Sequence, residues 1–170
     1  MDMNIVAAIA GGVLILAGLV FEARNFVLST LVGYAGLLLL HYVCYINVVN
    51  SSLLFWGAAA LLSCGIAMLS PRQEPHGSRG GNIYLLLGAV AGLLVGMSID
   101  ASMMILAAII GTLLGQLFYA RTPKGSWVKF SFSIFIHYFC AVGLKTIVST
   151  AIAGIAIEGL LRNQMVAVGG

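Results

Sequence analysis

Six apolar runs fill most of this chain, and only short polar segments separate them. The runs cover residues 4–20, 26–46, 53–69, 83–97, 101–119 and 128–161. A helix of about 20 mostly apolar residues is long enough to cross the hydrocarbon core of a bilayer. The pattern therefore predicts an all-α fold, namely a polytopic transmembrane helical bundle with about six spans.

The composition agrees with this fold class. Of the 170 residues, 61% are hydrophobic and 8% are charged, whereas a soluble domain carries about 25% charged residues. Membrane lipid is therefore the expected partner of the outer helix faces. The formal net charge is +3, and the basic residues are scattered at the edges of the apolar runs, which argues against binding of a nucleic acid.

One polar segment divides the chain into two parts of similar length. It contains Pro71, Pro75 and several glycines together with charged residues. Such backbone does not stay in hydrocarbon, because its polar groups would lack partners there. We therefore expect a first three-helix membrane half at residues 1–70, a polar loop at 71–82 and a second three-helix half at 83–170.

The last apolar run, residues 128–161, is too long for one straight crossing, because 20 helical residues already span about 30 Å. Either it forms one long helix or it breaks, and Gly143 and Lys145 mark the expected position of a break.

Lysine and arginine are concentrated in the segments that six spans would place on one side. Cytoplasmic loops carry an excess of these residues, so loops 71–82 and 120–129 are expected in the cytoplasm and both chain ends outside. The basic residues on the predicted cytoplasmic side are Arg24, Arg72, Arg79, Arg121, Lys124 and Lys129.

The two halves can be aligned at an offset of 78 residues (100 − 22), which matches Glu22 with Asp100 and Gly33 with Gly111. One interpretation is an inverted repeat of three helices, the architecture of many secondary transporters. The other is that apolar helices share a composition. The alignment leaves both open.

Glycines recur at intervals of four in the second half. The residues are Gly88, Gly92 and Gly96, followed by Gly111 and Gly115. Residues four apart share one face of a helix, and such GxxxG spacing lets a second backbone approach closely in lipid. We interpret these five residues as helix-packing positions. A glycine-lined permeation path is the alternative.

Three charged residues are candidates for a transport site. Glu22 and Asp100 end the first and fourth apolar runs, as solvated turn residues or as paired gates and proton acceptors. Lys145 lies inside the last run. A charge at membrane depth usually faces a cavity or a partner, although a lysine near a helix end can reach the headgroups instead. An Asp100–Lys145 pair is the natural hypothesis.

Two histidines, His41 and His137, are further candidates, and a packing role is the alternative for each. The chain lacks HExxH, CxxC, P-loop and nucleophile-elbow patterns, so the sequence predicts no metal, no cofactor and no enzymatic activity.

The second half resembles a prokaryotic integral membrane family called domain of unknown function 456. The resemblance rests on the glycine-spaced stretches at residues 87–96 and 109–117, followed by Gly143 and Lys145. It implies a multi-pass helical protein of a prokaryotic inner membrane and carries no particular activity.

Two functions fit these features. The first is a small transporter or channel for a small solute or ion, as a homodimer because one chain makes a thin bundle. The second is an accessory subunit that packs against partner membrane proteins through its glycine-lined faces, since few polar groups converge in the sequence.

Overall fold

The computed structural model describes residues 3–24, 26–43, 46, 48–69, 81–123 and 136–168. Within them every regular element is helical, which confirms the all-α bundle. The elements are α1 (Met3–Ala23), α2 (Ser29–Val43), α3 (Asn50–Leu69), α4 (Gly81–Met97), α5 (Ala101–Arg121), the π-helical turn η2 (Phe139–Gly143) and α8 (Leu144–Val168).

Four of these helices are long and apolar enough to cross a membrane. They contain the segments Val6–Ala23, Asn50–Leu69, Met103–Arg121 and Ile136–Leu161. The apolar helices α2 and α4 are shorter, and the 15 residues of α2 rise only about 22 Å against a hydrocarbon core about 30 Å thick. The structure thus supports a membrane protein, and the number of crossings stays a prediction.

The outer surface of the bundle is apolar. Large hydrophobic side chains are exposed on each of the long helices, among them Leu54 at 75% and Leu69 at 85%. Exposed apolar area of this extent is unfavourable in water and suits contact with lipid. Burial therefore follows from which helix faces meet each other, and not from hydrophobicity, which is similar all around each helix.

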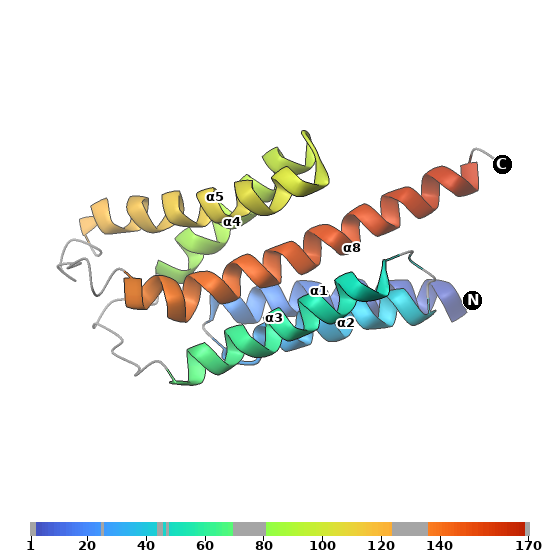
Figure 1. Ribbon diagram of the computed structural model, residues 1–170, viewed down its shortest axis with the longest axis horizontal. Coiled ribbons are helices and arrows are strands. Elements are labelled where there is room, and N and C mark those ends of the chain that lie inside the picture. Colours follow the sequence, from blue (N-terminus) through green and yellow to red (C-terminus); the bar gives the residue numbers. More distant parts are fainter. Residues whose placement is uncertain are drawn as a thin grey trace.

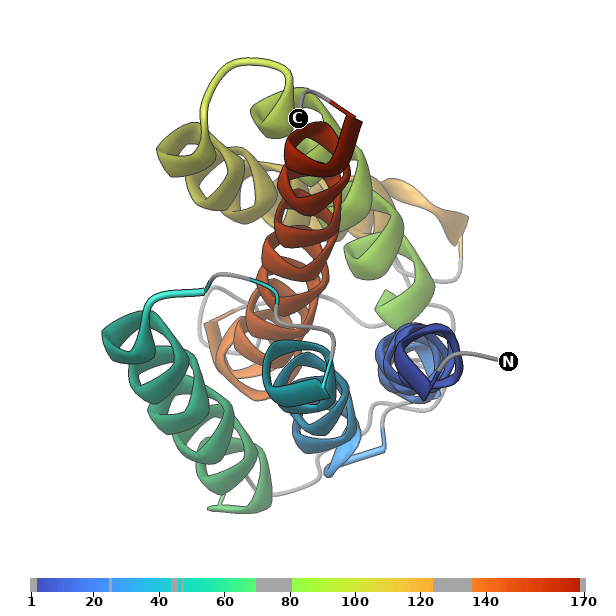
Figure 2. The same cartoon turned by 90° about the vertical axis from the view of Figure 1, so that its right-hand side faces the viewer.

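The helix α8 is the centre of the bundle (Figure 2). It packs against α1, α2 and α3 on one side and against α4 and α5 on the other, and 67% of the apolar segment Ile136–Leu161, which includes most of α8, is buried. In contrast, α3 makes its main contacts with α2, α8 and η2. The third helices of the two halves therefore have different environments, and the inverted repeat stays a prediction.

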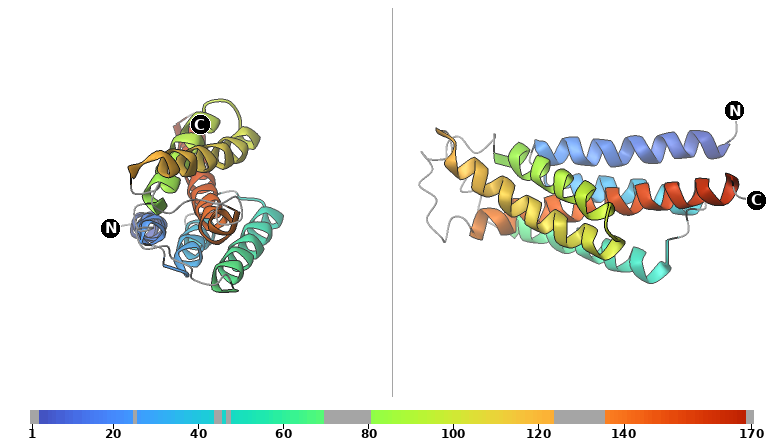
Figure 3. Two further views of the ribbon diagram at one scale, coloured as in Figure 1. Left: turned by 90° about the vertical axis from the view of Figure 1, so that its left-hand side faces the viewer. Right: turned by 90° about the horizontal axis from the view of Figure 1, so that it is seen from above.

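The α4–α5 hairpin is displaced along the long axis of the molecule. Its tip lies beside the middle of α8, whereas the start of α1 and the end of α8 lie together at one end (Figures 1 and 3). The contacts agree, because Gly154 of α8 lies against Leu93 and Met104 near this tip. The end of α8 continues beyond the hairpin and meets Ile46 at Gly159.

The last apolar run is continuous where the structure describes it. One helical segment extends from Ile136 to Leu161, so the expected break at Gly143 and Lys145 is wrong. The chain instead widens into the π-helical turn η2, which ends at Gly143, and continues as α8. Such single π turns insert a residue without ending a helix.

The predicted loops are shorter than expected where they can be compared. Gly81 and Asn82 begin α4, and residues 120 and 121 still belong to α5. Residues 70–80 and 124–135 lie outside the described residues, as does the start of the predicted last span.

Glycines set the close approach of α4 and α5. A side chain on Gly88 would collide with the backbone of Gly111, one on Gly92 with that of Ala107, and one on Gly115 with that of Tyr84. The two backbones are therefore in direct contact. In lipid, where apolar side chains gain little by leaving their solvent, this van der Waals contact is what holds two helices together.

We expect Gly111→Ala to push α4 and α5 apart, because the added methyl group overlaps the carbonyl of Gly88. Overpacking of this kind costs about 1–3 kcal/mol, which a reversible unfolding titration in mixed micelles would measure. Gly12→Ala in α1 is the matched control, because its methyl group would meet no atom within 4 Å. Equal stability of the two variants would contradict the contact.

Candidate functional site

The candidate site is an ion pair buried between the first and last helices. The ammonium Nζ of Lys145 lies 3.5 Å from the carboxylate Oε1 of Glu22, and the two side chains are 0% and 1% exposed. The residues come from the last turn of α1 and the first turn of α8. Helices at opposite ends of the chain are thereby joined through their charges.

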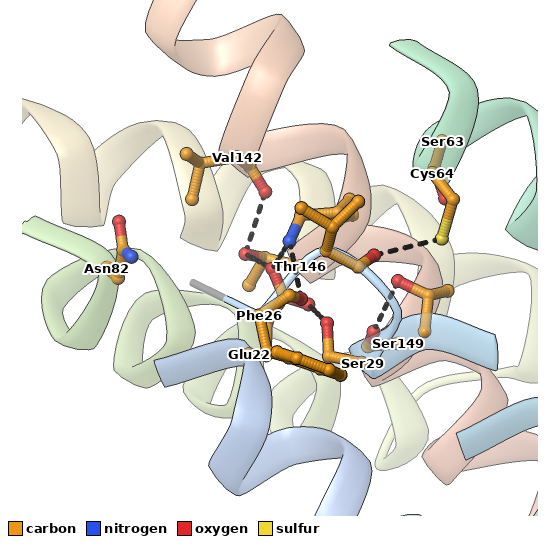
Figure 4. A network of polar contacts seen from close by, with 12 residues as sticks. Glu22, Phe26, Ser29, Ser63, Cys64, Asn82, Val142, Thr146 and Ser149 are labelled. Atoms are coloured by element: carbon orange, nitrogen blue, oxygen red, sulfur yellow. Dashed lines mark hydrogen bonds and ion pairs between the residues drawn. The ribbon is translucent and has the colours of Figure 1, made fainter. Parts of the chain in front are cut away.

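Further polar groups surround the pair (Figure 4). Ser29 Oγ donates to Glu22 Oε2. Lys145 Nζ also donates to the backbone carbonyl of Phe26 at 3.1 Å. The hydroxyl of Thr146 lies 2.9 Å from the carbonyl of Val142 and 3.3 Å from Glu22 Oε1, so its proton is shared between them. Both charges thus have neutral hydrogen-bond partners as well as each other.

A second polar layer lies next to the pair. Ser149 Oγ donates to Thr30 Oγ1 at 3.1 Å and links α8 to α2. Thr150 donates to the carbonyl of Thr146, one turn earlier in the same helix. All four side chains are at most 3% exposed. The site is therefore a buried cluster of exchangeable protons rather than an isolated pair of charges.

The connection between α1 and α2 positions most of these groups. The backbone N–H groups of Arg24 and Phe26 both donate to the carbonyl of Phe21, which ends α1 and turns the chain back over Glu22. Cys64 of α3 donates a hydrogen bond to the carbonyl of Val27 at 3.1 Å, so α3 also contacts this turn. Ser29 then begins α2 beside the carboxylate.

The pair lies well inside the molecule. The side chain of Lys145 is 0% exposed and its ammonium lies against Glu22, so it does not extend to the surface as the headgroup interpretation requires. The alternative interpretation, an interior charge with a partner, holds.

The prediction that Asp100 is the partner of Lys145 is wrong. Asp100 has extended backbone at the N-cap of α5 and is exposed. Met104, one turn further on, packs against Gly154, which lies about 14 Å along α8 from Lys145 (nine residues). The displacement of the α4–α5 hairpin therefore separates Asp100 from Lys145, and Glu22 takes its place as the counter-charge.

The two histidines lie away from this cluster. His41 Nδ1 is 2.9 Å from the carbonyl of Ile46, and its ring meets Tyr42 edge to face at 5.0 Å between centroids, which fits the packing role. His137 is exposed in the turn of helix before η2. Among the described residues no group of three histidine, cysteine or acidic side chains is placed to hold a metal ion.

Sequence reasoning missed the hydroxyl groups of the site. On α8 the polar residues Lys145, Thr146, Ser149 and Thr150 recur at intervals of three and four, which places them along one stretch of the helix surface. That stripe in an otherwise apolar run was the available signal. It predicts a polar interior face on α8, although it does not identify the helix opposite.

The fold and the site together define a helical bundle with four helices that could cross a membrane and with a buried ion pair. Comparison with family models, curated proteins and solved structures gives no match to this chain. The resemblance to domain of unknown function 456 therefore stays a prediction.

We expect Glu22→Leu and Lys145→Met each to destabilise the protein by about 3–5 kcal/mol, because each leaves one buried charge without its partner. The double variant Glu22→Leu with Lys145→Met removes both charges and should recover most of this loss. Unfolding titrations in mixed micelles would measure all three.

Asp100→Asn is the matched control for these variants, since it neutralises an exposed carboxylate. Its effect should not exceed about 1 kcal/mol, because the charge interactions of an exposed carboxylate at a helix N-terminus are worth no more than this. Additive losses in the double variant would show that the two charges do not interact.

Proposed function

We propose that the protein is a small transporter or channel of a prokaryotic cell membrane, and that the proton is the ion it moves, alone or together with a small solute. The Glu22–Lys145 pair is the observation that supports this most. Ionisable side chains at membrane depth are costly, and in membrane proteins they usually mark ion pathways and proton relays.

A purely structural role explains this pair poorly. Well-packed apolar side chains of similar size usually hold two elements together as well as a buried ion pair does, or better. Beyond the polar cluster these helices already share an apolar core, in which Leu37, Leu40 and Ile152 are fully buried. The two charges are therefore better explained by a functional step that changes the charge of the site than by a role in holding the helices together.

The geometry suggests what that step is. Both side chains are almost completely buried, so without rearrangement only a species as small as a proton has access to Glu22. Protonation of Glu22 would remove the negative charge that balances Lys145. The ammonium would keep its hydrogen bond to the Phe26 carbonyl but lose the ion pair, so the attachment of α8 to the α1–α2 turn would weaken.

A change of this kind needs an element with two arrangements. The π turn η2 ends two residues before Lys145, and π turns are frequent at functional sites and at helix bends. We propose that the helical segment bends at η2 in this change, while the part before η2 is held by a hydrogen bond from Tyr138 to Asn82 Oδ1 (2.6 Å).

Purified protein in liposomes tests the proposal. Vesicles are loaded with a pH-sensitive dye, and a potassium gradient with valinomycin sets the membrane potential. We expect the native protein to admit protons faster than empty vesicles do. The double variant Glu22→Leu with Lys145→Met should keep the fold and abolish this flux, because it removes both charged groups of the site.

Asp100→Asn serves as the control with unchanged flux. Two outcomes contradict the proposal: native protein that is no faster than empty vesicles, with and without a potential, or a folded double variant that is as fast as native protein.

The accessory-subunit function has one observation in its favour, the exposed apolar hollow along α4 and α5. It predicts that vesicles with the protein show no more proton flux than empty vesicles, and that a stable partner membrane protein co-purifies in stoichiometric amount. The flux measurement therefore separates the two functions.

The orientation proposed from the basic residues places Arg121 on the cytoplasmic side and the α2–α3 connection, with Val49 70% exposed, on the outside. In a variant without native cysteines, we expect Val49→Cys to react with a membrane-impermeant maleimide in intact cells. Arg121→Cys should react only after the membrane is opened. Labelling of both sites from outside would contradict the orientation.

A further inference from the structure

An apolar groove of about 760 Å³ runs along the outer side of the α4–α5 hairpin. This size lies within the range of ligand pockets. Small residues form its floor, since α4 and α5 are in backbone contact there, and larger exposed side chains form its walls. The floor includes Ala91, Gly92 and Gly111, and the walls include Leu87, Leu114 and Phe118.

One end of the groove is polar. Tyr84 and Thr122 line the groove there, and the ring of Tyr84 lies 5.7 Å from that of Tyr119. A second, smaller hollow shares Leu114 and Phe118 with the groove and is bordered by Arg121, whose side chain is exposed. Tyrosines are enriched at the level of lipid headgroups, so this end is suited to the membrane interface.

The length of the groove matches one leaflet. From Tyr84 to Val95, which both line it, α4 rises about 16 Å (eleven residues). Half of a hydrocarbon core about 30 Å thick is about 15 Å. An acyl chain with its headgroup at the tyrosine end would therefore reach the far end of the groove at the middle of the bilayer.

We infer that this groove binds one acyl chain of an anionic phospholipid and that Arg121 holds the phosphate of its headgroup. A guanidinium binds phosphate oxygens through two parallel hydrogen bonds. A second copy of the chain or a partner helix would explain the apolar walls equally well. Neither would explain why Tyr84 lines the same end of the groove beside which Arg121 lies.

The test uses the whole protein in detergent micelles, with native mass spectrometry as the measurement. Phosphatidylglycerol and phosphatidylcholine with identical acyl chains are added in separate titrations. We expect native protein to retain one phosphatidylglycerol in preference to phosphatidylcholine. Ala91→Trp, which fills the groove from its floor, should reduce binding of both lipids about tenfold.

Arg121→Gln should leave the groove open and reduce only the preference for phosphatidylglycerol, by about fivefold, which corresponds to the roughly 1 kcal/mol of one basic residue at an anionic surface. Ala58→Trp, at an exposed alanine of α3, and Arg24→Gln, at another exposed arginine, are the matched controls. Both should bind as native protein does. Ala107→Phe replaces Ala91→Trp if the latter does not fold.

Three results would overturn the inference. One is retention of lipid by both groove-filling variants at the level of Ala58→Trp. Another is an unchanged preference in Arg121→Gln. The third is a native dimer that Ala91→Trp converts to a monomer without any change in bound lipid, since the groove would then be a contact between two copies.

Discussion

The structure depends on the fact that neither Glu22 nor Lys145 can be buried alone. Removing an unpaired charge from water costs several kcal/mol even after the protein relaxes, and both side chains are almost completely excluded from solvent. The turn after α1 and the start of α8 must therefore come together, although 123 residues separate the two positions (145 − 22). The rest of the chain folds within this constraint, which brings α8, the last helix, against α1 and α2.

Around that contact, cohesion comes from small residues. The alanines Ala151 and Ala156 of α8 are 0% and 2% exposed, and in the α1–α2 hairpin a side chain on Gly18 would collide with Gly33. Helices in lipid gain little from hiding apolar groups, so the approach of backbones replaces the hydrophobic effect as the source of packing energy. Where two helices approach through small residues, few side chains cover the surface beside the contact. The α4–α5 hairpin therefore has a groove with a floor of glycine and alanine.

The sequence was sufficient to predict the helices and the glycine faces, because both depend on local pattern. It was insufficient for the partner of Lys145. Asp100 was the expected partner because equal spans would bring all turns to two common levels. The α4–α5 hairpin is instead displaced so that Met104 packs against Gly154, a relation between distant side chains that periodicity does not contain. The polar stripe on α8 could have indicated a buried polar face, although only the fold identifies Glu22, Ser29 and Thr30 as the groups opposite it.

The π turn resolves a conflict between two attachments of the last helical segment. Before the turn, Tyr138 is bonded to Asn82 at the start of α4; after it, Lys145 is bonded to the α1–α2 turn on the other side of the bundle. Each residue of an α-helix advances about 100° around the axis, and a π turn adds one residue without a matching advance in the hydrogen-bond pattern. Without η2 the side chains after Gly143 would be rotated by about that angle, and Lys145 would no longer face Glu22 while Tyr138 faced α4. The contacts before and after η2 therefore both depend on this π turn. Any change that weakens the Glu22–Lys145 ion pair also removes one of the two contacts that stabilise the π-helical conformation.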